Sequence, residues 1–262
     1  MQREVSDRPV EINPSLHGAW IDPAGDWDGR AVLFLHGHTD DMNAVGELTL
    51  RLARALGARG VASLRINFRG EGDRMRRDLD STLDTRVEDT EAAYAFMAAR
   101  AGVDVARVGV AGWCLGATTA IATAARHPRW FRSMAAWGSP IGDQWTAMTS
   151  SETAQRALRD GEATEELVGW KTITTKRAFY ESFRGVDVSR LLGEYPGAFL
   201  SVRGSADECV GDEMAFLECA RGTPRESVIL GGMDHVFGAF DPSSGHAERA
   251  IEVTADWFVR TL

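Results

Sequence analysis

The sequence predicts an α/β protein built on a mostly parallel sheet with helices on both faces. Short runs rich in Val, Ile, Leu and Ala alternate along the chain with longer segments in which apolar residues recur at helical spacing. Most of these runs are apolar throughout, as expected for strands that are covered on both faces. The chain has 262 residues, enough for one large domain with a sizeable core or at most two small ones.

Six apolar runs are expected to form the parallel strands, with helices between them. Two shorter runs near the N-terminus are expected to form an antiparallel edge at residues 10–13 and 17–20. The parallel strands are predicted at residues 31–36, 61–67, 107–113, 133–137, 198–203 and 227–230. The helices are predicted at residues 44–59, 85–100, 115–126, 211–221 and 245–262.

One segment interrupts this alternation between residues 143 and 195. It is longer than an ordinary connection between a helix and a strand, and it is polar sequence interspersed with aromatic residues. It predicts a small helical cap above the carboxyl ends of the strands, where open α/β sheets bind ligands. The α/β core would then comprise residues 1–142 and 196–262, with the cap at residues 143–195. The alternative is that most of these aromatics pack the insertion's own core.

Charge, hydropathy and cysteine content limit the classes of partner and the cellular compartment that we expect for this protein. The formal net charge is −9, which argues against nucleic acid or an anionic membrane as a partner. The N-terminus is polar, and no apolar run approaches the ~20 residues needed to span a bilayer. Three cysteines without a C-x-x-C pair predict reduced thiols in the cytoplasm. No His/Cys cluster has convincing metal-ligand spacing, so neither a metal nor another cofactor is expected.

A possible nucleophile lies at the turn after the third expected parallel strand. Gly112-Trp113-Cys114-Leu115-Gly116 has the pattern G-x-C-x-G, the cysteine counterpart of the G-x-S-x-G elbow that exposes a serine on a sharp strand-to-helix turn. A thiol is partly ionised at neutral pH, and its position at a helix N-terminus near an imidazole would lower its pKa further. Cys114 is therefore the expected nucleophile.

The groups that would assist this nucleophile follow other strands. His235 comes after the last expected strand and is the expected general base, and Asp207 follows the preceding strand and would orient it. Glu208 and Asp212 are less well placed substitutes. The backbone N–H groups of Leu115 and His38 are expected to form an oxyanion hole. Four tryptophans are candidate walls of the substrate pocket, with ordinary packing as the alternative: Trp113, Trp137, Trp145 and Trp170.

These motifs together resemble the α/β-hydrolase superfamily over nearly the whole chain. The resemblance rests on LFLHGHTDD, LRINFRGEGD, VGVAGWCLGATTA, VRGSADECV and GMDHVF, and on the order nucleophile, acid, histidine. The phrase RGEGD is similar to the serine-aminopeptidase-like branch. The elbow with its cysteine resembles dienelactone hydrolase, but that second likeness covers the elbow alone and implies nothing about a lactone substrate.

The leading functional hypothesis is hydrolysis or acyl transfer on a small-molecule ester, lactone or thioester. The Cys114–His235–Asp207 triad would carry it in an esterase-like or thioesterase-like enzyme that is a monomer or a homodimer. Thiolates leave readily from tetrahedral intermediates, which disfavours amide substrates. Two alternatives stay open. One is a lyase of natural-product biosynthesis that eliminates acetate from an acetylated tetronate-type intermediate, with His235 as the base. The other is a small-molecule binding protein without catalysis.

Overall fold

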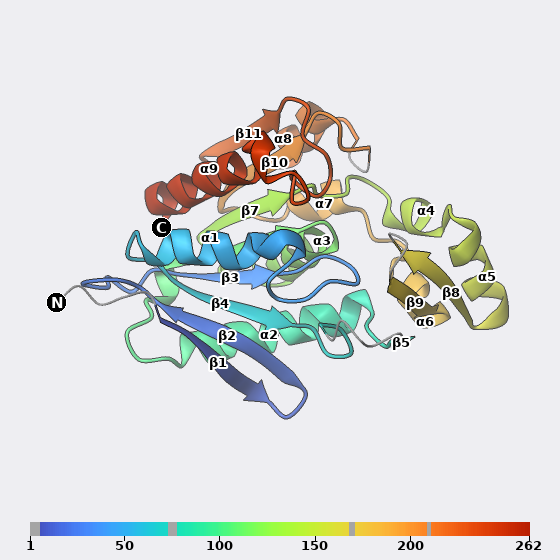
Figure 1. Cartoon of the computed structure of the whole chain (residues 1–262), viewed down its shortest axis with the longest axis horizontal. Coiled ribbons are helices and arrows are strands. Elements are labelled where there is room, and N and C mark those ends of the chain that lie inside the picture. The colour runs from blue at the N-terminus through green and yellow to red at the C-terminus, as the bar shows by residue number, and fades with distance from the viewer. Residues whose placement is uncertain (1–5, 73–77, 168–170, 209–210) are drawn as a thin grey trace.

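A computed structural model describes residues 6–72, 78–167, 171–208 and 211–262, and it confirms the predicted α/β class (Figure 1). Within these ranges an eight-stranded sheet has the order β1-β2-β4-β3-β6-β7-β10-β11. Its strands are β1 (Ser6–Asn13), β2 (Leu16–Asp22), β3 (Ala31–Leu35), β4 (Ala62–Asn67), β6 (Val108–Trp113), β7 (Ser133–Trp137), β10 (Ala198–Gly204) and β11 (Arg225–Leu230).

The strand directions follow the sequence pattern. From β4 to β11 all neighbouring strands are parallel, whereas β2 is antiparallel to both β1 and β4. The predicted antiparallel edge is therefore confirmed, although its strands are longer than expected. All five residues of β3 are buried, because a parallel strand with helices on both sides has no solvent-facing side.

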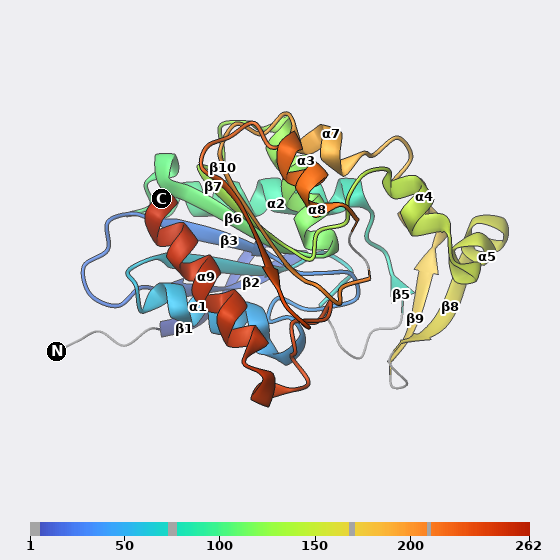
Figure 2. The same ribbon diagram turned by 90° about the horizontal axis from the view of Figure 1, so that it is seen from above.

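Helices cover both faces of the sheet (Figure 2). On one face lie α1 (Leu48–Gly57) and α9 (His246–Thr261), and on the other lie α2 (Leu83–Ala98), α3 (Leu115–Arg126), α7 (Val188–Leu192) and α8 (Glu213–Cys219). The expected helix at residues 44–59 begins later, because Ala44 and Glu47 have φ of 60° and 57° and Val45–Glu47 forms a separate 3-10 turn.

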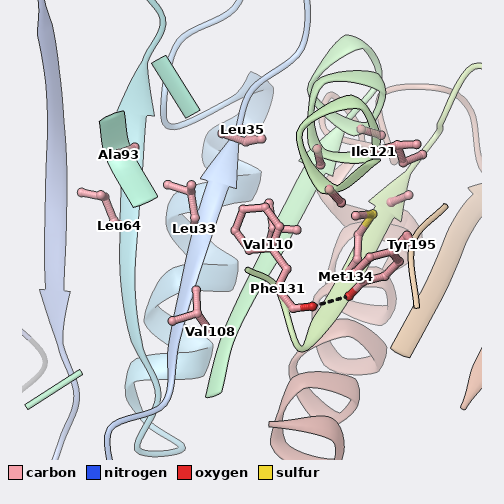
Figure 3. Packing of buried hydrophobic residues seen from close by; sticks show 14 of the residues in the cluster. Leu33, Leu35, Leu64, Ala93, Val108, Val110, Ile121, Phe131, Met134 and Tyr195 are labelled. Atoms are coloured by element: carbon pink, nitrogen blue, oxygen red, sulfur yellow. Dashed lines mark hydrogen bonds between the residues drawn. The ribbon is translucent and has the colours of Figure 1, made fainter. Parts of the chain in front are cut away.

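Alternation along the strands divides the core into two layers. Val32 and Phe34 of β3 pack with α1 and α9, whereas Leu33 and Leu35 pack on the opposite face with α2 and α3. Figure 3 shows the second layer, in which Leu33, Leu64, Val110 and Met134 form a row across the sheet. Within the part of the chain described, no helix combines the length and apolar character needed to cross a membrane.

The insertion is a mixed α/β unit, which corrects the expectation of a purely helical cap. It contains α4 (Gln144–Thr149), α5 (Glu152–Asp160), the antiparallel strands β8 (Glu162–Leu167) and β9 (Lys171–Lys176), and α6 (Arg177–Glu181), and β5 (Asp78–Leu79) pairs with β9. The threonine-rich sequence of β9 explains the strand, since β-branched residues favour extended backbone.

The insertion lies beyond the carboxyl ends of the parallel strands, towards which β3, β4 and β7 point in Figure 1. Its buried aromatic residues Phe179, Tyr180 and Phe183 pack in one cluster with Leu83 of α2 and Leu115 of α3. For these three aromatics, packing of the insertion onto the core is therefore the structural role.

Candidate active site

The elbow predicted around Cys114 is present as a sharp turn between β6 and α3. Cys114 has φ 52° and ψ −120°, an unfavourable backbone conformation for a residue with a Cβ. The two flanking glycines make this turn possible. A Cβ on Gly112 would lie 2.3 Å from the carbonyl oxygen of Gly116, and a Cβ on Gly116 would lie 2.0 Å from that of Leu35. The spacing G-x-C-x-G is thus a steric requirement of this turn.

The two other predicted triad residues are in contact. Nδ1 of His235 lies 2.9 Å from Oδ2 of Asp207, whose side chain is completely buried, while that of His235 is 25 % exposed. Asp207 follows β10 and His235 follows β11, so the parallel pairing of these strands brings both loops to the same edge of the sheet. Gly204 allows the approach, because a Cβ there would lie 1.8 Å from the carbonyl oxygen of Met233.

Charge favours the protonated form of His235. Burial alone would lower the pKa of this imidazole, but hydrogen bonds with Asp207 and Cys114 and the negative charges of both groups outweigh burial and raise the pKa to about 11. Since Nδ1 faces Asp207, Nε2 is the ring nitrogen left for the thiol.

Of the two predicted oxyanion-hole donors, Leu115 lies within the elbow and His38 follows the neighbouring strand β3. Leu115 is the first residue of α3, so its N–H has no acceptor within the helix. A Cβ on Gly37 would lie 3.6 Å from Cβ of Cys114, which places the backbone next to His38 close to Cys114. The ring of His38 stacks on Phe179 of the insertion with centroids 4.4 Å apart.

His36, at the end of β3, has a structural role. Its Nδ1–H donates to the carbonyl oxygen of Gly37 over 2.7 Å, and its Nε2 accepts the N–H of Phe68 over 3.2 Å. Burial lowers its pKa to about 4, so the ring is neutral near pH 7. Both ring nitrogens of His36 are thus engaged in hydrogen bonds within the protein. In the described ranges no cluster of three or more His, Cys, Asp or Glu side chains could hold a metal.

The two carboxylates considered as substitutes for Asp207 are not the partners of His235. Asp212 caps the N-terminus of α8 by accepting the N–H groups of Met214 and Ala215, each over 3.1 Å. Glu208 is exposed. The choice of Asp207 as the partner of His235 therefore agrees with the geometry.

The four candidate pocket tryptophans differ in their surroundings. Trp113 lies beside the site, because its indole N–H donates to the carbonyl oxygen of His235 over 3.2 Å. Trp137 is buried, donates to Thr254 of α9 over 2.8 Å and, with Trp113, lines an apolar recess on the α1 face of the sheet. Trp145 lies in the insertion with the guanidinium of Arg184 3.7 Å above its ring. Trp170 lies outside the described residues.

Gly138 is a site residue that the sequence reasoning missed. It follows β7 with φ 51°, and a Cβ there would lie 3.1 Å from Oδ2 of Asp207 and 3.2 Å from Nδ1 of His235. A side chain at this position would crowd the hydrogen bond between them. The signal available in the sequence was a glycine directly after a predicted strand, the position at which the other site residues also occur.

A second buried group in this region is Glu71, which is 8 % exposed. Burial would raise its pKa, but the cation of Arg86 and then the neighbouring His36 and His38 outweigh burial and lower the pKa to about 2. Glu71 is therefore ionised, and His36 neutral, in the folded protein near pH 7.

These two groups predict loss of stability in acid. The unfolded chain takes up a proton at His36 near its ordinary pKa of 6.5, whereas the folded protein resists protonation until about 4. The resulting stabilisation, roughly 3 kcal/mol, is present above pH 6.5 and is lost as the pH falls towards 4. Glu71 adds a further loss between 4.5 and about 2. Urea unfolding at several pH values should show this decline.

A variant of His36 tests whether this residue causes the loss of stability between pH 6.5 and 4. His36→Gln has no titrating group at this position, so its free energy of unfolding should change less between pH 6.5 and 4 than that of the native protein. Equal slopes would contradict the assignment. The raised pKa of His235 acts in the opposite sense, because its stabilisation is present below pH 6.5 and is lost as the pH rises towards about 11.

Comparisons with known proteins agree with this architecture. Residues 59–164 match the model of the dienelactone hydrolase family. The fold is similar to that of Est1E from Butyrivibrio proteoclasticus, with a TM-score of 0.71 and 17 % identity over 99 % of both chains. It is also similar to a dienelactone hydrolase from Anabaena variabilis, with a TM-score of 0.65 and 16 % identity over 99 % of this chain and 100 % of that one.

A third similar structure is the α/β hydrolase GrgF from Penicillium sp. sh18, with a TM-score of 0.69 and 16 % identity over 98 % of both chains. No curated protein sequence matches the chain. The parallel sheet, the strand–elbow–helix turn and the similar solved structures show that this chain has the α/β-hydrolase fold. Its similarity to the dienelactone hydrolase family model extends over residues 59–164.

Proposed function

We propose that this protein hydrolyses an ester, lactone or thioester, or transfers its acyl group, with Cys114 as the nucleophile. The observation that carries the proposal is the series of contacts from Cys114 to His235 and from His235 to Asp207, at the carboxyl edge of the sheet. A nucleophile that contacts a base, which is oriented in turn by a buried carboxylate, is the arrangement that covalent acyl transfer requires.

The reaction would proceed in two steps. The Cys114 thiolate attacks the acyl carbon, and the N–H groups of Leu115 and His38 stabilise the negative oxygen of the tetrahedral intermediate. The bond to the leaving group then breaks, and that group takes the proton held by the His235 imidazolium. In the second step neutral His235 accepts a proton from water, which attacks the thioester. Collapse of this intermediate releases the acid and restores the thiolate–imidazolium pair.

The cysteine limits the substrate class. An intermediate that carries both a thiolate and an amine expels the thiolate more readily, because the thiolate is the weaker base. Alkoxide, phenolate and thiolate leaving groups compete better, which favours esters, lactones and thioesters. Est1E is described with ferulic acid bound, so aromatic acyl esters belong in a substrate screen beside aliphatic ones.

Intact-mass spectrometry tests the proposal. The protein is incubated with p-nitrophenyl esters and acyl thioesters of increasing acyl length, quenched in acid and digested to locate the modified residue. We expect a mass increase equal to one acyl group on Cys114, with release of the leaving group. Acylation confined to other residues, together with turnover, would refute the assignment of the nucleophile.

Turnover in water enriched in heavy oxygen separates the possible reactions. Hydrolysis places the label in the carboxylic acid product, and acyl transfer to an added alcohol or thiol does not. Elimination yields an unlabelled acid and a new ultraviolet-absorbing alkene, which would support the lyase alternative. Binding of esters without any product or adduct would identify a binding protein.

A further inference from the structure

We infer that the buried ion pair between Glu71 and Arg86 positions the oxyanion hole. The oxyanion loop is defined here as residues 36–39, from the end of β3 to Thr39. The inference rests on the proposed function, since it assigns positioning residues to the same acyl-transfer site. Neither side chain is expected to touch the substrate.

Arg86 holds the beginning of the oxyanion loop. It lies on α2, is fully buried, and pairs with Glu71 at 2.6 Å. The other arm of its guanidinium donates to the carbonyl oxygen of His36. The guanidinium carbon of Arg86 lies 3.8 Å from the centroid of the Phe68 ring. Packing against this ring therefore also restrains the guanidinium. The planar fork of arginine can serve these separate acceptors at once, which a lysine ammonium does with less defined geometry.

Glu71 holds the end of the same loop. Its Oε2 accepts the backbone N–H of Thr39 over 3.3 Å, and its Oε1 accepts the Arg86 donor and the hydroxyl of Ser81. Thr39 has φ 64°, an uncommon conformation for a β-branched residue. The two partners of the ion pair thus fix the loop on both sides of Gly37 and His38, and the direction of the His38 N–H depends on that fixation.

The same guanidinium is also connected to the second donor. Nε of Arg86 donates to Oγ1 of Thr119 over 3.2 Å, and this hydroxyl donates to the carbonyl oxygen of Leu115 over 2.8 Å. Leu115 is the first residue of α3 and supplies the other proposed oxyanion N–H. Arg86 therefore links the loop that carries one donor with the helix turn that carries the other.

Because both charges of the Glu71–Arg86 pair are buried, a substitution in either residue can also lower the stability of the fold. Removing one partner of a buried ion pair leaves the other charge uncompensated and destabilises the fold. A useful test must therefore separate a displaced oxyanion hole from general loss of structure. Two reactions of Cys114 provide that separation, because only one of them forms an oxyanion.

The experiment compares two rates at Cys114 in the full-length protein. Acylation by p-nitrophenyl acetate passes through a tetrahedral oxyanion, whereas alkylation by iodoacetamide displaces iodide from a saturated carbon without one. The variants are Arg86→Lys, which keeps the charge but loses the fork, and Glu71→Gln, which keeps the shape but loses the charge. Arg65→Lys is the control. The side chain of Arg65 is also buried, and it pairs with Asp7 at 2.6 Å. Its hydrogen-bond partners, Asp7 and Asn43, lie outside the oxyanion loop.

We expect acylation by both test variants to slow by about 10- to 100-fold, less than the ~10²–10³-fold effect of removing an oxyanion donor outright. Alkylation should stay within about threefold of the native rate, and kcat should fall more than KM rises. The control should keep the native ratio of the two rates even where its stability falls.

Three other results would contradict the inference, and they can be distinguished from one another. A native rate of acylation in either folded variant would show that the pair does not position the hole. Parallel loss of both rates would assign it a structural role alone. Absence of any Cys114 adduct in the native protein would instead refute the proposed function, and the inference with it.

Discussion

Replacing Cys114 with alanine is expected to abolish turnover, with a fall in kcat of at least about 10⁴-fold. The variant lacks the atom that forms the acyl bond, and neither Leu115 nor His38 can supply a nucleophile in its place. Alanine keeps the Cβ that the strained turn already tolerates, so the fold should be retained. The measurement is steady-state hydrolysis of the best ester from the substrate screen, together with intact mass after incubation.

Cys219 provides the matched control for this experiment. It lies in α8, where its thiol donates to the carbonyl oxygen of Ala215 over 3.3 Å, and it is partly exposed. Cys219→Ala should hydrolyse esters and form the acyl adduct as the native protein does. If Cys114→Ala retained native turnover, the triad proposal would fail and only the fold assignment would stand.

Replacing Asp207 with asparagine is expected to lower kcat by about 10³- to 10⁴-fold with a small change in KM, by analogy with the effect of this change in a serine protease triad. The amide can no longer stabilise the imidazolium, and it can hold the ring in the wrong tautomer. The pKa of His235 should therefore fall from its raised value of about 11. Folding should survive, because the two side chains have nearly the same shape.

The expected fall in the pKa of His235 can be measured through the pH dependence of Cys114 alkylation. In the native protein the His235 imidazolium persists above its ordinary pKa of 6.5, so a positive charge lies beside Cys114 around neutral pH. In Asp207→Asn the imidazolium is lost at lower pH, and the alkylation profile should change its shape between pH 6 and 9. Asp212→Asn, which alters only the cap of α8, should keep the native profile. An unchanged profile in Asp207→Asn would contradict the proposed coupling.

The overall architecture could be predicted because its signals are local. Each buried strand, such as β3 or β6, is a short apolar run, and each helix that covers it repeats apolar residues at its own period. The elbow was also recognisable locally, since Gly112 and Gly116 meet backbone atoms within the turn or at the end of the adjacent strand. The chain order of Cys114, Asp207 and His235 then followed from the order of the strands.

The nature of the insertion was harder to predict. Its strand β9 (Lys171–Lys176) is short, and its pairing with β8 and β5 is decided by contacts with segments distant in sequence, including residues before α2. Polar sequence with scattered aromatics is compatible with helix or strand until the surface that buries Phe179 and Phe183 is known. That surface comes from α2 and α3.

Gly138 and the Glu71–Arg86 pair show a second kind of missing information. Nothing adjacent to Arg86 in the sequence indicates that its guanidinium reaches the end of β3, because a charged residue on a helix usually faces solvent. The sequence by itself determined the fold class and the sharp turn at Cys114, and it singled out Asp207 and His235, which the structure places in contact, since these features depend on short patterns. Only the tertiary structure decided which groups support them, because a buried charge is stable solely where the folded chain brings its compensating partners together.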